Sequence, residues 1–283
     1  MVAPLALETQ FSLFMFVSTV AVLALGFRVS VPGTSLREVL VGFLRTDWKY
    51  IGVAWVITAG VNEAAHRFHA DRLYTDVIYA AEGSAVLAFQ AVTAPSITLV
   101  MSVLYLVGFP FLVLFTYFAV KAKSPREARR YALAYACLTL SALPFFLLVP
   151  VGITAYYLPA VDPLLYDLHP VIGAGIAATD TLVKAFPSLH AGLSVLAALY
   201  AREAGRRYAR GAWVLAAGIT LSTLYLGIHW LSDIAFVVAL VALAYAVSRL
   251  IDPVDLNPFS SRSPRSSDSP SGGSRSRPEF ERR

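Results

Sequence analysis

The chain has 283 residues, of which 57% are hydrophobic and only 14% are charged, and its mean hydropathy is +0.64. This composition excludes an ordinary soluble domain and indicates an integral membrane protein. The formal net charge is +5, but the positive residues cluster between apolar runs and at the C-terminal end, which is typical of cytoplasmic loops and argues against nucleic acid as a partner.

Long apolar runs follow one another along the chain, and about 17 to 25 helical residues are enough to cross a bilayer. The sequence therefore predicts an all-α, polytopic transmembrane helix bundle of about six to seven spans. In chain order the expected spans are residues 11–27, 50–64, 97–120, 131–152, 188–201, 212–228 and 234–250. The second span is either 50–64 or 73–92, and polar side chains interrupt both. We favour the first, with 73–92 as an interfacial helix.

The charge of the loops predicts the orientation. Arg and Lys cluster after the first and third of these spans, and none precedes the first, so we expect the N-terminus outside and the C-terminus in the cytoplasm of a cell-membrane protein. Three parts follow from this reading: N-terminal spans with the interfacial helix (residues 1–92), a catalytic membrane core (93–252) and a basic, disordered cytosolic tail (253–283).

Two histidines and an aspartate stand beside the ends of apolar runs. His229 and Asp233 are four residues apart, so in a helix the carboxylate lies one turn from the imidazole. The carboxylate then accepts the proton of one ring nitrogen and leaves the other as a nucleophile. His190 follows Pro187 and Ser188, a helix-start signal, so it lies near the positive end of a helix dipole that favours phosphate. The predicted topology places all three on the outer face.

Two stretches resemble the second and third signatures of the type-2 phosphatidic-acid phosphatase superfamily, P-S-G-H and S-R-x5-H-x3-D. The counterparts here are P-S-L-H at residues 187–190 and a stretch of matching spacing at 222–233. The resemblance covers residues 156–250 and implies the core helical bundle of that family. It also implies that His229 attacks phosphorus, that Asp233 orients and stabilises it, and that His190 protonates the leaving oxygen.

Departures from those signatures point to one branch of the superfamily. Thr223 stands where the phosphatases carry a phosphate-binding arginine, and Leu189 replaces the usual glycine. The basic first signature, K-x6-R-P, is missing, because residues 151–182 contain no Lys or Arg. This pattern resembles the inositolphosphotransferase branch, similar to inositol phosphorylceramide synthases, whose second signature also reads F-P-S-L-H.

The missing cations bear on the substrate's charge. A phosphomonoester carries nearly two negative charges and a phosphodiester one, and each lost charge-assisted contact costs roughly 1.5 to 3 kcal/mol. The absence of these basic side chains therefore disfavours binding of a dianionic monoester more than binding of a monoanionic diester. We expect Lys184 and the helix N-termini at Ser188 and Ser232 to hold a monoanion, and we assign Ser222 to phosphate binding as well.

The sequence thus predicts a membrane-embedded lipid phosphotransferase or phosphatase, with transfer of a phosphodiester headgroup such as phosphoinositol as the favoured reaction. The alternatives are a phosphatidate or polyprenyl-diphosphate phosphatase and, outside enzymology, a transporter or scaffold built on the same bundle. The chemistry of the site calls for no metal or other cofactor. The expected partners are membrane lipids, as substrates.

Overall fold

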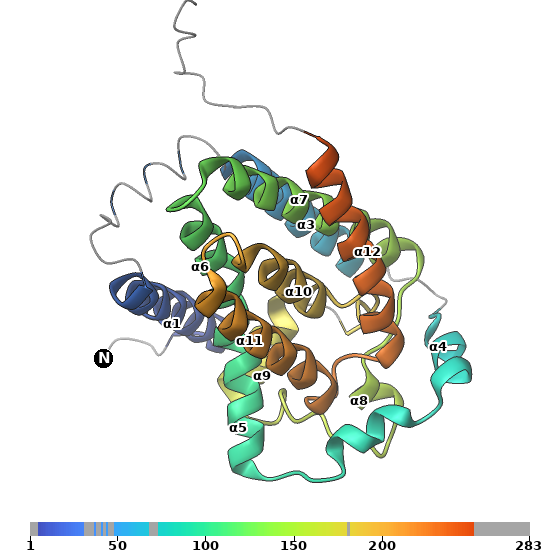
Figure 1. Cartoon of the computed structure of the whole chain (residues 1–283). Helices are drawn as coiled ribbons and strands as arrows, with labels where there is room; N and C mark the ends of the chain where they lie inside the picture. The colour runs from blue at the N-terminus through green and yellow to red at the C-terminus, as the bar shows by residue number, and fades with distance from the viewer. Residues whose placement is uncertain are drawn as a thin grey trace, which may run out of the picture.

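A computed structural model describes residues 5–30, 48–67, 73–179 and 182–251, together with Arg37, Val41 and Leu44. Within these residues the chain folds into helices joined by turns and loops, and the only extended pairing is an isolated bridge between Val151 and Lys184. The predicted all-α fold is confirmed (Figure 1). The predicted tail at 253–283 lies outside the described residues.

The helices are labelled in Figure 1. In chain order their bounds are α1 (Leu7–Ser30), α3 (Trp48–Arg67), α4 (Thr75–Glu82), the 3-10 helix η1 (Ala85–Gln90), α5 (Pro95–Val103), the π-helix η2 (Leu104–Gly108), α6 (Phe109–Lys121), α7 (Pro125–Leu148), α8 (Thr154–Tyr157), α9 (Pro170–Thr179), α10 (Leu189–Ala201), α11 (Arg206–Tyr225) and α12 (Leu231–Leu250).

Among the described residues, four helical segments are long and apolar enough to cross a membrane. They are Leu7–Val29, Pro95–Lys121, Pro125–Leu148 and Leu231–Leu250. These segments and their hydropathy make the chain an integral membrane protein. The apolar helix α10 has only 13 residues, about 20 Å at 1.5 Å per residue, and α11 carries three arginines in its first turns. The total of seven spans stays a prediction.

Helix α10 lies in the middle of the bundle, with α6, α7, α11 and α12 packed around it (Figure 1). Its buried positions are mostly small residues, and a Cβ atom added at Gly192 would lie 2.5 Å from Val237 of α12. Small side chains let helix backbones approach closely, which is what stabilises helix pairs in lipid, where burial of apolar surface gives little driving force. The sequence of α10 therefore suits a central helix.

The α5–α6 rod changes its winding where it passes α10. Residues Leu104–Gly108 form a π-helical turn, and Pro110 follows in the first turn of α6. Proline has no N–H and clashes with the carbonyl group four residues earlier, so a wider turn relieves the conflict. The π turn carries Tyr105, Phe109 follows directly, and both rings contact His190 of α10.

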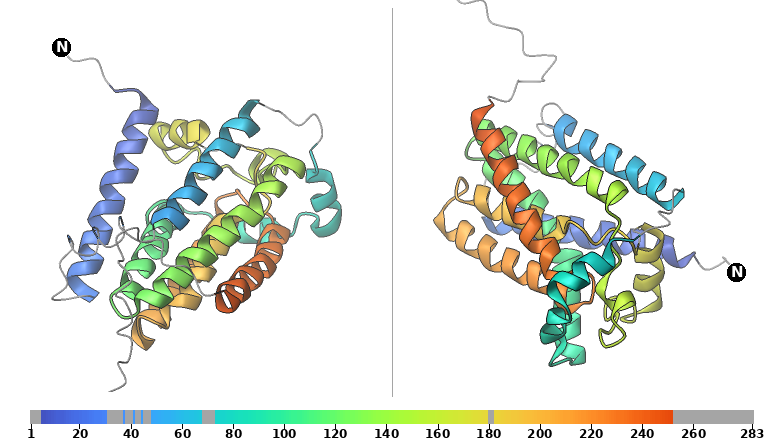
Figure 2. Two further views of the ribbon diagram at one scale, coloured as in Figure 1. Left: turned by 90° about the horizontal axis from the view of Figure 1, so that it is seen from above. Right: turned by 90° about the vertical axis from the view of Figure 1, so that its right-hand side faces the viewer.

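Residues 75–90, which form α4 and η1, cross one end of the bundle, and we name this segment the strap. Its α4 lies on the side of the bundle opposite α1 (Figure 1, Figure 2). The strap is broken at Gly83, which has a φ of 58°, so residues 73–92 form no continuous helix. Residues 48–67 do form one, but only its part Lys49–Thr58 is apolar and α3 is not one of the four segments above, so 50–64 as the second span stays a prediction.

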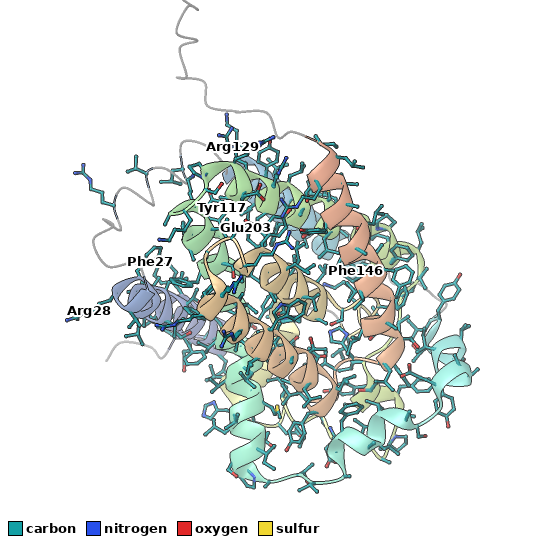
Figure 3. All side chains as sticks on the ribbon, in the orientation of Figure 1. Phe27, Arg28, Tyr117, Arg129, Phe146 and Glu203 are labelled. Atoms are coloured by element: carbon teal, nitrogen blue, oxygen red, sulfur yellow. The ribbon has the colours of Figure 1, made fainter. Side chains whose placement is uncertain are left out.

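The opposite end of the bundle is rich in arginine. Arg249, in the last turn of α12, donates to Glu127 at 2.6 Å and to Glu203 at 3.3 Å. Figure 3 shows Glu203 at this end together with Arg129. The positive loops at residues 121–130 and 202–210 also lie here, while α12 begins at the strap end. The bundle thus has one end with concentrated positive charge.

Candidate functional site

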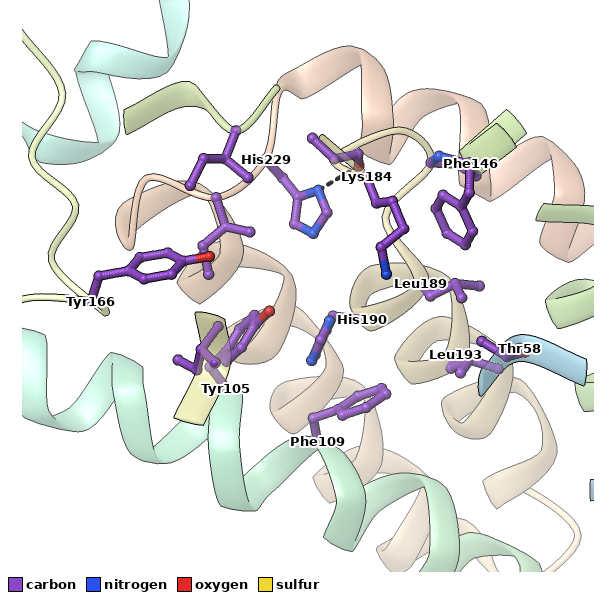
Figure 4. Close-up of a pocket in the computed structure, with 15 residues that line it drawn as sticks. Thr58, Tyr105, Phe109, Phe146, Tyr166, Lys184, Leu189, His190, Leu193 and His229 are labelled. Atoms are coloured by element: carbon purple, nitrogen blue, oxygen red, sulfur yellow. Dashed lines mark hydrogen bonds between the residues drawn. The ribbon is translucent and has the colours of Figure 1, made fainter. Parts of the chain in front are cut away.

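A cavity of about 270 Å³ lies at the strap end of the bundle. Besides Thr58 of α3, five polar side chains line it, on the π turn, the connections and the start of α10, and Figure 4 shows these five converging on one space. They are Tyr105, Tyr166, Lys184, His190 and His229. Apolar side chains form most of the remaining wall, and none of the lining residues that the structure describes is acidic. The cavity therefore offers hydrogen-bond donors and an apolar surface together, which suits an anion attached to an apolar chain.

His229 presents one ring nitrogen to this space. Its Nδ1 atom lies 2.8 Å from the carbonyl oxygen of Ala185 and 3.1 Å from Oδ2 of Asp233. A carbonyl oxygen only accepts hydrogen bonds, so Nδ1 carries the proton and Nε2 keeps its lone pair. Figure 4 shows Nε2 pointing into the cavity, toward His190. The imidazole is thus held in the tautomer that a nitrogen nucleophile requires.

A tight turn between α11 and α12 fixes the backbone of His229. The N–H groups of Ile228 and His229 both donate to the carbonyl oxygen of Thr223, at 3.2 Å each, and Gly227 has a φ of 77°. Trp230 follows and is completely buried, with its indole N–H bonded to the carbonyl oxygen of Gly152 at 2.8 Å. The histidine is therefore held by its own backbone as well as by its ring.

Asp233 is completely buried in the first turn of α12. Its Oδ2 atom accepts the backbone N–H of Trp230 at 2.8 Å in addition to Nδ1–H of His229. A carboxylate is favoured at a helix N-terminus, where backbone N–H groups lack partners within the helix. Asp233 therefore caps α12 and orients His229 with one oxygen atom.

His190 lies on the opposite wall of the cavity, in the first turn of α10. Its ring stacks on Tyr105, with centroids 4.1 Å apart and an interplanar angle of 18°, and contacts Phe109 at 4.2 Å. Ser188 caps this helix by accepting the N–H of Ala191 at 3.4 Å. The structure thus brings His190 and His229 to one cavity from two separate helix starts.

Lys184 is the only Lys or Arg among the described lining residues. It precedes Ala185, whose carbonyl oxygen holds His229, and Figure 4 shows its amine in the space between the two histidines. The amine also lies 5.8 Å from the ring of Phe146, a cation–π arrangement. A positive charge therefore stands beside the candidate nucleophile.

Several residues expected to contact phosphate do not line the cavity. Ser188 is completely buried, and its hydroxyl faces the helix that it caps. Ser222 is also buried, and its hydroxyl donates to the carbonyl oxygen of Ile219 at 2.7 Å. Both hydroxyls already bond to backbone groups, that of Ser188 as an acceptor and that of Ser222 as a donor, and their assignment to phosphate binding stays a prediction. Thr223, at the family's arginine position, is buried as well and contributes its backbone carbonyl group to the turn.

The N-terminus of α12 is also occupied, contrary to the expectation for Ser232. The carboxylate of Glu82, from the strap, accepts the backbone N–H groups of Leu231 at 3.0 Å and Ser232 at 2.7 Å. The positive end of α12 therefore faces a carboxylate of the chain itself, and of the two helix ends only that of α10 borders the cavity.

Four aromatic residues of the cavity, namely Tyr105, Phe109, Phe146 and Tyr166, were not predicted from the sequence. Pro110 within an apolar run was the available signal for two of them, because a proline there demands an irregular turn. Tyr166 lies in the loop before α9 and carried no pattern that sets it apart.

A comparison with protein families decides the wider relationship. The family model described as the PAP2 superfamily matches residues 76–247, more than half of the chain. The chain belongs to the PAP2 superfamily. No curated protein and no solved structure matched it.

The PAP2 match includes Lys184, His190, His229 and Asp233, and it begins inside the strap, at Asp76. Membership agrees with the superfamily resemblance of residues 187–190 and 222–233. Members of the PAP2 superfamily are phosphatases and phosphotransferases, so the relationship supports a lipid phosphoesterase and favours an enzyme over a transporter or scaffold.

Proposed function

We propose that this PAP2 protein transfers a phosphodiester headgroup, such as phosphoinositol, from a membrane lipid to an alcohol acceptor through a covalent phosphohistidine on His229. The observation that carries the proposal is the composition of the cavity. A nucleophilic ring nitrogen faces it, and Lys184 is its one Lys or Arg among the described lining residues.

The charge of the cavity supports a diester substrate. One ammonium group matches the single negative charge of a phosphodiester, whereas a monoester needs further charged donors. The hydroxyl groups of Tyr105 and Tyr166 reach the same space and are neutral donors and acceptors (Figure 4). Such groups suit a polyol headgroup. The apolar wall, with Phe109 and Phe146, suits the chains of a lipid.

The reaction divides into two transfers. In the first, Nε2 of His229 attacks phosphorus, the bond to the lipid oxygen breaks, and His190 gives that oxygen a proton. Asp233 compensates the positive charge that develops on the imidazole through Nδ1–H. In the second, His190 takes the proton of the acceptor hydroxyl, whose oxygen attacks phosphorus and releases His229. The covalent histidine conserves the energy of the diester bond between the two transfers.

We also propose that the cavity faces the outside of the cell membrane, with the C-terminus in the cytoplasm. The arginine-rich end of the bundle lies opposite the cavity, as expected if positive loops stay inside. The proposed catalytic core remains residues 93–252. The strap precedes it, contacts the start of α12 and lies, from Asp76 on, in the matched region.

The test uses purified protein in detergent or liposomes, with headgroup-labelled phosphatidylinositol in the presence and absence of alcohol-bearing lipid acceptors. We expect the label to move to the acceptor, and donor consumption to depend on the acceptor. Phosphatidic acid and a polyprenyl diphosphate serve as monoester-type competitors. His229→Gln is the control for contaminating activity.

Acceptor-independent, rapid release of phosphate from phosphatidic acid or the polyprenyl diphosphate would overturn the transferase proposal and establish the phosphatase alternative. A labelled intermediate that survives in base and is lost in acid distinguishes phosphohistidine from a direct transfer. Its absence in rapid-quench samples of an active enzyme would contradict the covalent mechanism.

A further inference from the structure

Glu82 connects the strap to the helix that carries Asp233. Its Oε1 atom accepts the N–H of Leu231 at 3.0 Å, and its Oε2 atom accepts both the N–H and the hydroxyl group of Ser232, at 2.7 and 2.6 Å. These amides belong to the first turn of α12, whose N–H groups have no partner within the helix. A single side chain, 149 residues away from Leu231 along the chain, therefore supplies three acceptor contacts at this helix start.

Two carboxylates accept the backbone N–H groups at the start of α12. Asp233 takes the N–H of Trp230 and faces His229, while Glu82 takes the next two N–H groups. Neither Glu82 nor Ser232 lines the cavity. Glu82 therefore contacts the start of α12 from outside the cavity. A shift of the turn at residues 227–233, which we name the catalytic turn, would move Asp233 relative to His229.

Other contacts of the strap end on the same part of the fold. The side-chain amide of Gln90 donates to the carbonyl oxygen of Tyr225, at the end of α11, at 2.8 Å. The hydroxyl group of Thr75 accepts the N–H of Gly152, the residue whose carbonyl oxygen holds the Trp230 indole. The strap thus binds both sides of the turn that presents His229.

We propose that Glu82 is a positioning residue of the phosphoryl transfer, which fills the anion site at the start of α12 and holds Asp233 and His229 in register. The inference rests on the proposed function. Because a carboxylate occupies this helix start, the phosphate of the substrate is directed to Lys184 and the start of α10 instead. Glu82 acts through the catalytic turn and does not touch the substrate.

Glu82→Gln tests the proposal, since it keeps the size of the side chain but leaves one acceptor oxygen for three donors. Glu203→Gln is the matched control, because Glu203 accepts from Arg249 at the other end of the same helix. Misplacing a catalytic group by about 1 Å costs up to about a hundredfold in rate. We expect kcat of Glu82→Gln to fall about tenfold to a hundredfold, KM to stay within about twofold, and Glu203→Gln to keep the wild-type kcat.

Both variants are compared by thermal unfolding in detergent, where we expect similar midpoints. A wild-type kcat for Glu82→Gln, or an equal loss in Glu203→Gln, would overturn the proposal. If part of the Glu82→Gln protein is unfolded, its apparent kcat falls for that reason alone. Labelling of His229 measures the fraction of active sites, and kcat is divided by this fraction before the variants are compared.

A second measurement does not depend on turnover. Glu82→Ala leaves the amides of Leu231 and Ser232 open to an anion, so inorganic phosphate should raise its unfolding midpoint more than that of the wild type or Glu203→Ala. Equal responses of the three proteins would overturn the role of Glu82 as the occupant of the anion site. Failure of the proposed function is distinct, because it is seen in the wild type as absence of headgroup transfer.

Discussion

Nδ1 of His229 lies 3.1 Å from Oδ2 of Asp233, although His229 precedes α12 and Asp233 lies in its first turn. The contact therefore arises from a helix cap and not from two residues on one helical face. The same carboxylate oxygen accepts the N–H of Trp230, so the cap and the orientation of the nucleophile share one atom. Changes to Asp233 must affect the helix start and the histidine together.

Asp233→Asn should leave a folded but poorly active protein. The amide oxygen of asparagine can take the place of Oδ2 and still accept the N–H of Trp230 and Nδ1–H of His229, but the amide carries no negative charge. The change therefore removes the charge that compensates the imidazolium, and an aspartate-to-asparagine change in a comparable triad costs up to about 10⁴-fold in kcat. We expect a loss of about a hundredfold or more in single-turnover assays. Asp167→Asn, an exposed change, is the control, and a loss below about fivefold would contradict the role of Asp233.

His229→Gln should abolish turnover and the covalent intermediate, because glutamine has no nucleophilic nitrogen. Rapid-quench labelling with headgroup-labelled substrate measures the intermediate directly. The matched control is His169→Gln, since His169 is exposed and does not line the cavity. Retention of more than about a tenth of the wild-type rate by His229→Gln would show that another group attacks phosphorus.

Lys184 should contribute mainly through its charge. Loss of a hydrogen bond to a charged group costs about 1.5 to 3 kcal/mol, so Lys184→Gln should lower kcat/KM roughly tenfold to a hundredfold. Lys184→Arg keeps the charge and should retain most of the activity. Lys123→Gln, at the arginine-rich end, controls for the change in net charge. Steady-state kinetics at several salt concentrations measures the effect, and equal losses in Lys184→Gln and Lys184→Arg would contradict it.

Local sequence patterns predicted the parts of the site that depend on neighbours along the chain. The four-residue spacing correctly paired His229 with Asp233, although the contact comes from a helix cap and not from one helical face, and the Pro-Ser step marked the start of α10. The assignment of Ser188 and Ser222 to phosphate binding stays a prediction, because a motif does not reveal that their hydroxyl groups bond to a backbone N–H and a backbone carbonyl group. Local bonds compete with ligand contacts for such side chains.

Contacts between residues far apart in the chain could not be predicted from the sequence, for a different reason. Glu82 lies in a segment that the sequence allowed as a second span and favoured as an interfacial helix, and nothing local shows that its carboxylate contacts α12. Tyr105 reaches the cavity through a π turn, an irregularity that apolar periodicity does not register. The helical class was predictable because the composition is strongly apolar and the apolar residues follow one another in runs long enough to cross a bilayer.

The orientation can be measured by labelling with an impermeant thiol reagent in intact cells, in a Cys137→Ser background. Single cysteines at Asp162 and Asp167, both exposed and at the cavity end, should react. Cysteines at Arg126 and Arg207, exposed at the arginine-rich end, should react only after permeabilisation. The opposite pattern would place the cavity in the cytoplasm and contradict the charge rule for this chain.

Gly227 should be essential to the turn that carries His229. Its φ of 77° costs any L side chain about 1 to 2 kcal/mol, and a Cβ atom there would also lie 2.7 Å from the carbonyl oxygen of Asp162. Gly205 provides the matched control, because its φ is 133° but nothing lies within 4 Å of its Cβ position. We expect Gly227→Ala to lower both the unfolding midpoint and kcat, because relief of the clash moves His229. Gly205→Ala should lower stability modestly and leave kcat unchanged. Equal kcat values for the two variants would contradict this prediction, because they would show that the position of His229 does not depend on the backbone conformation at Gly227.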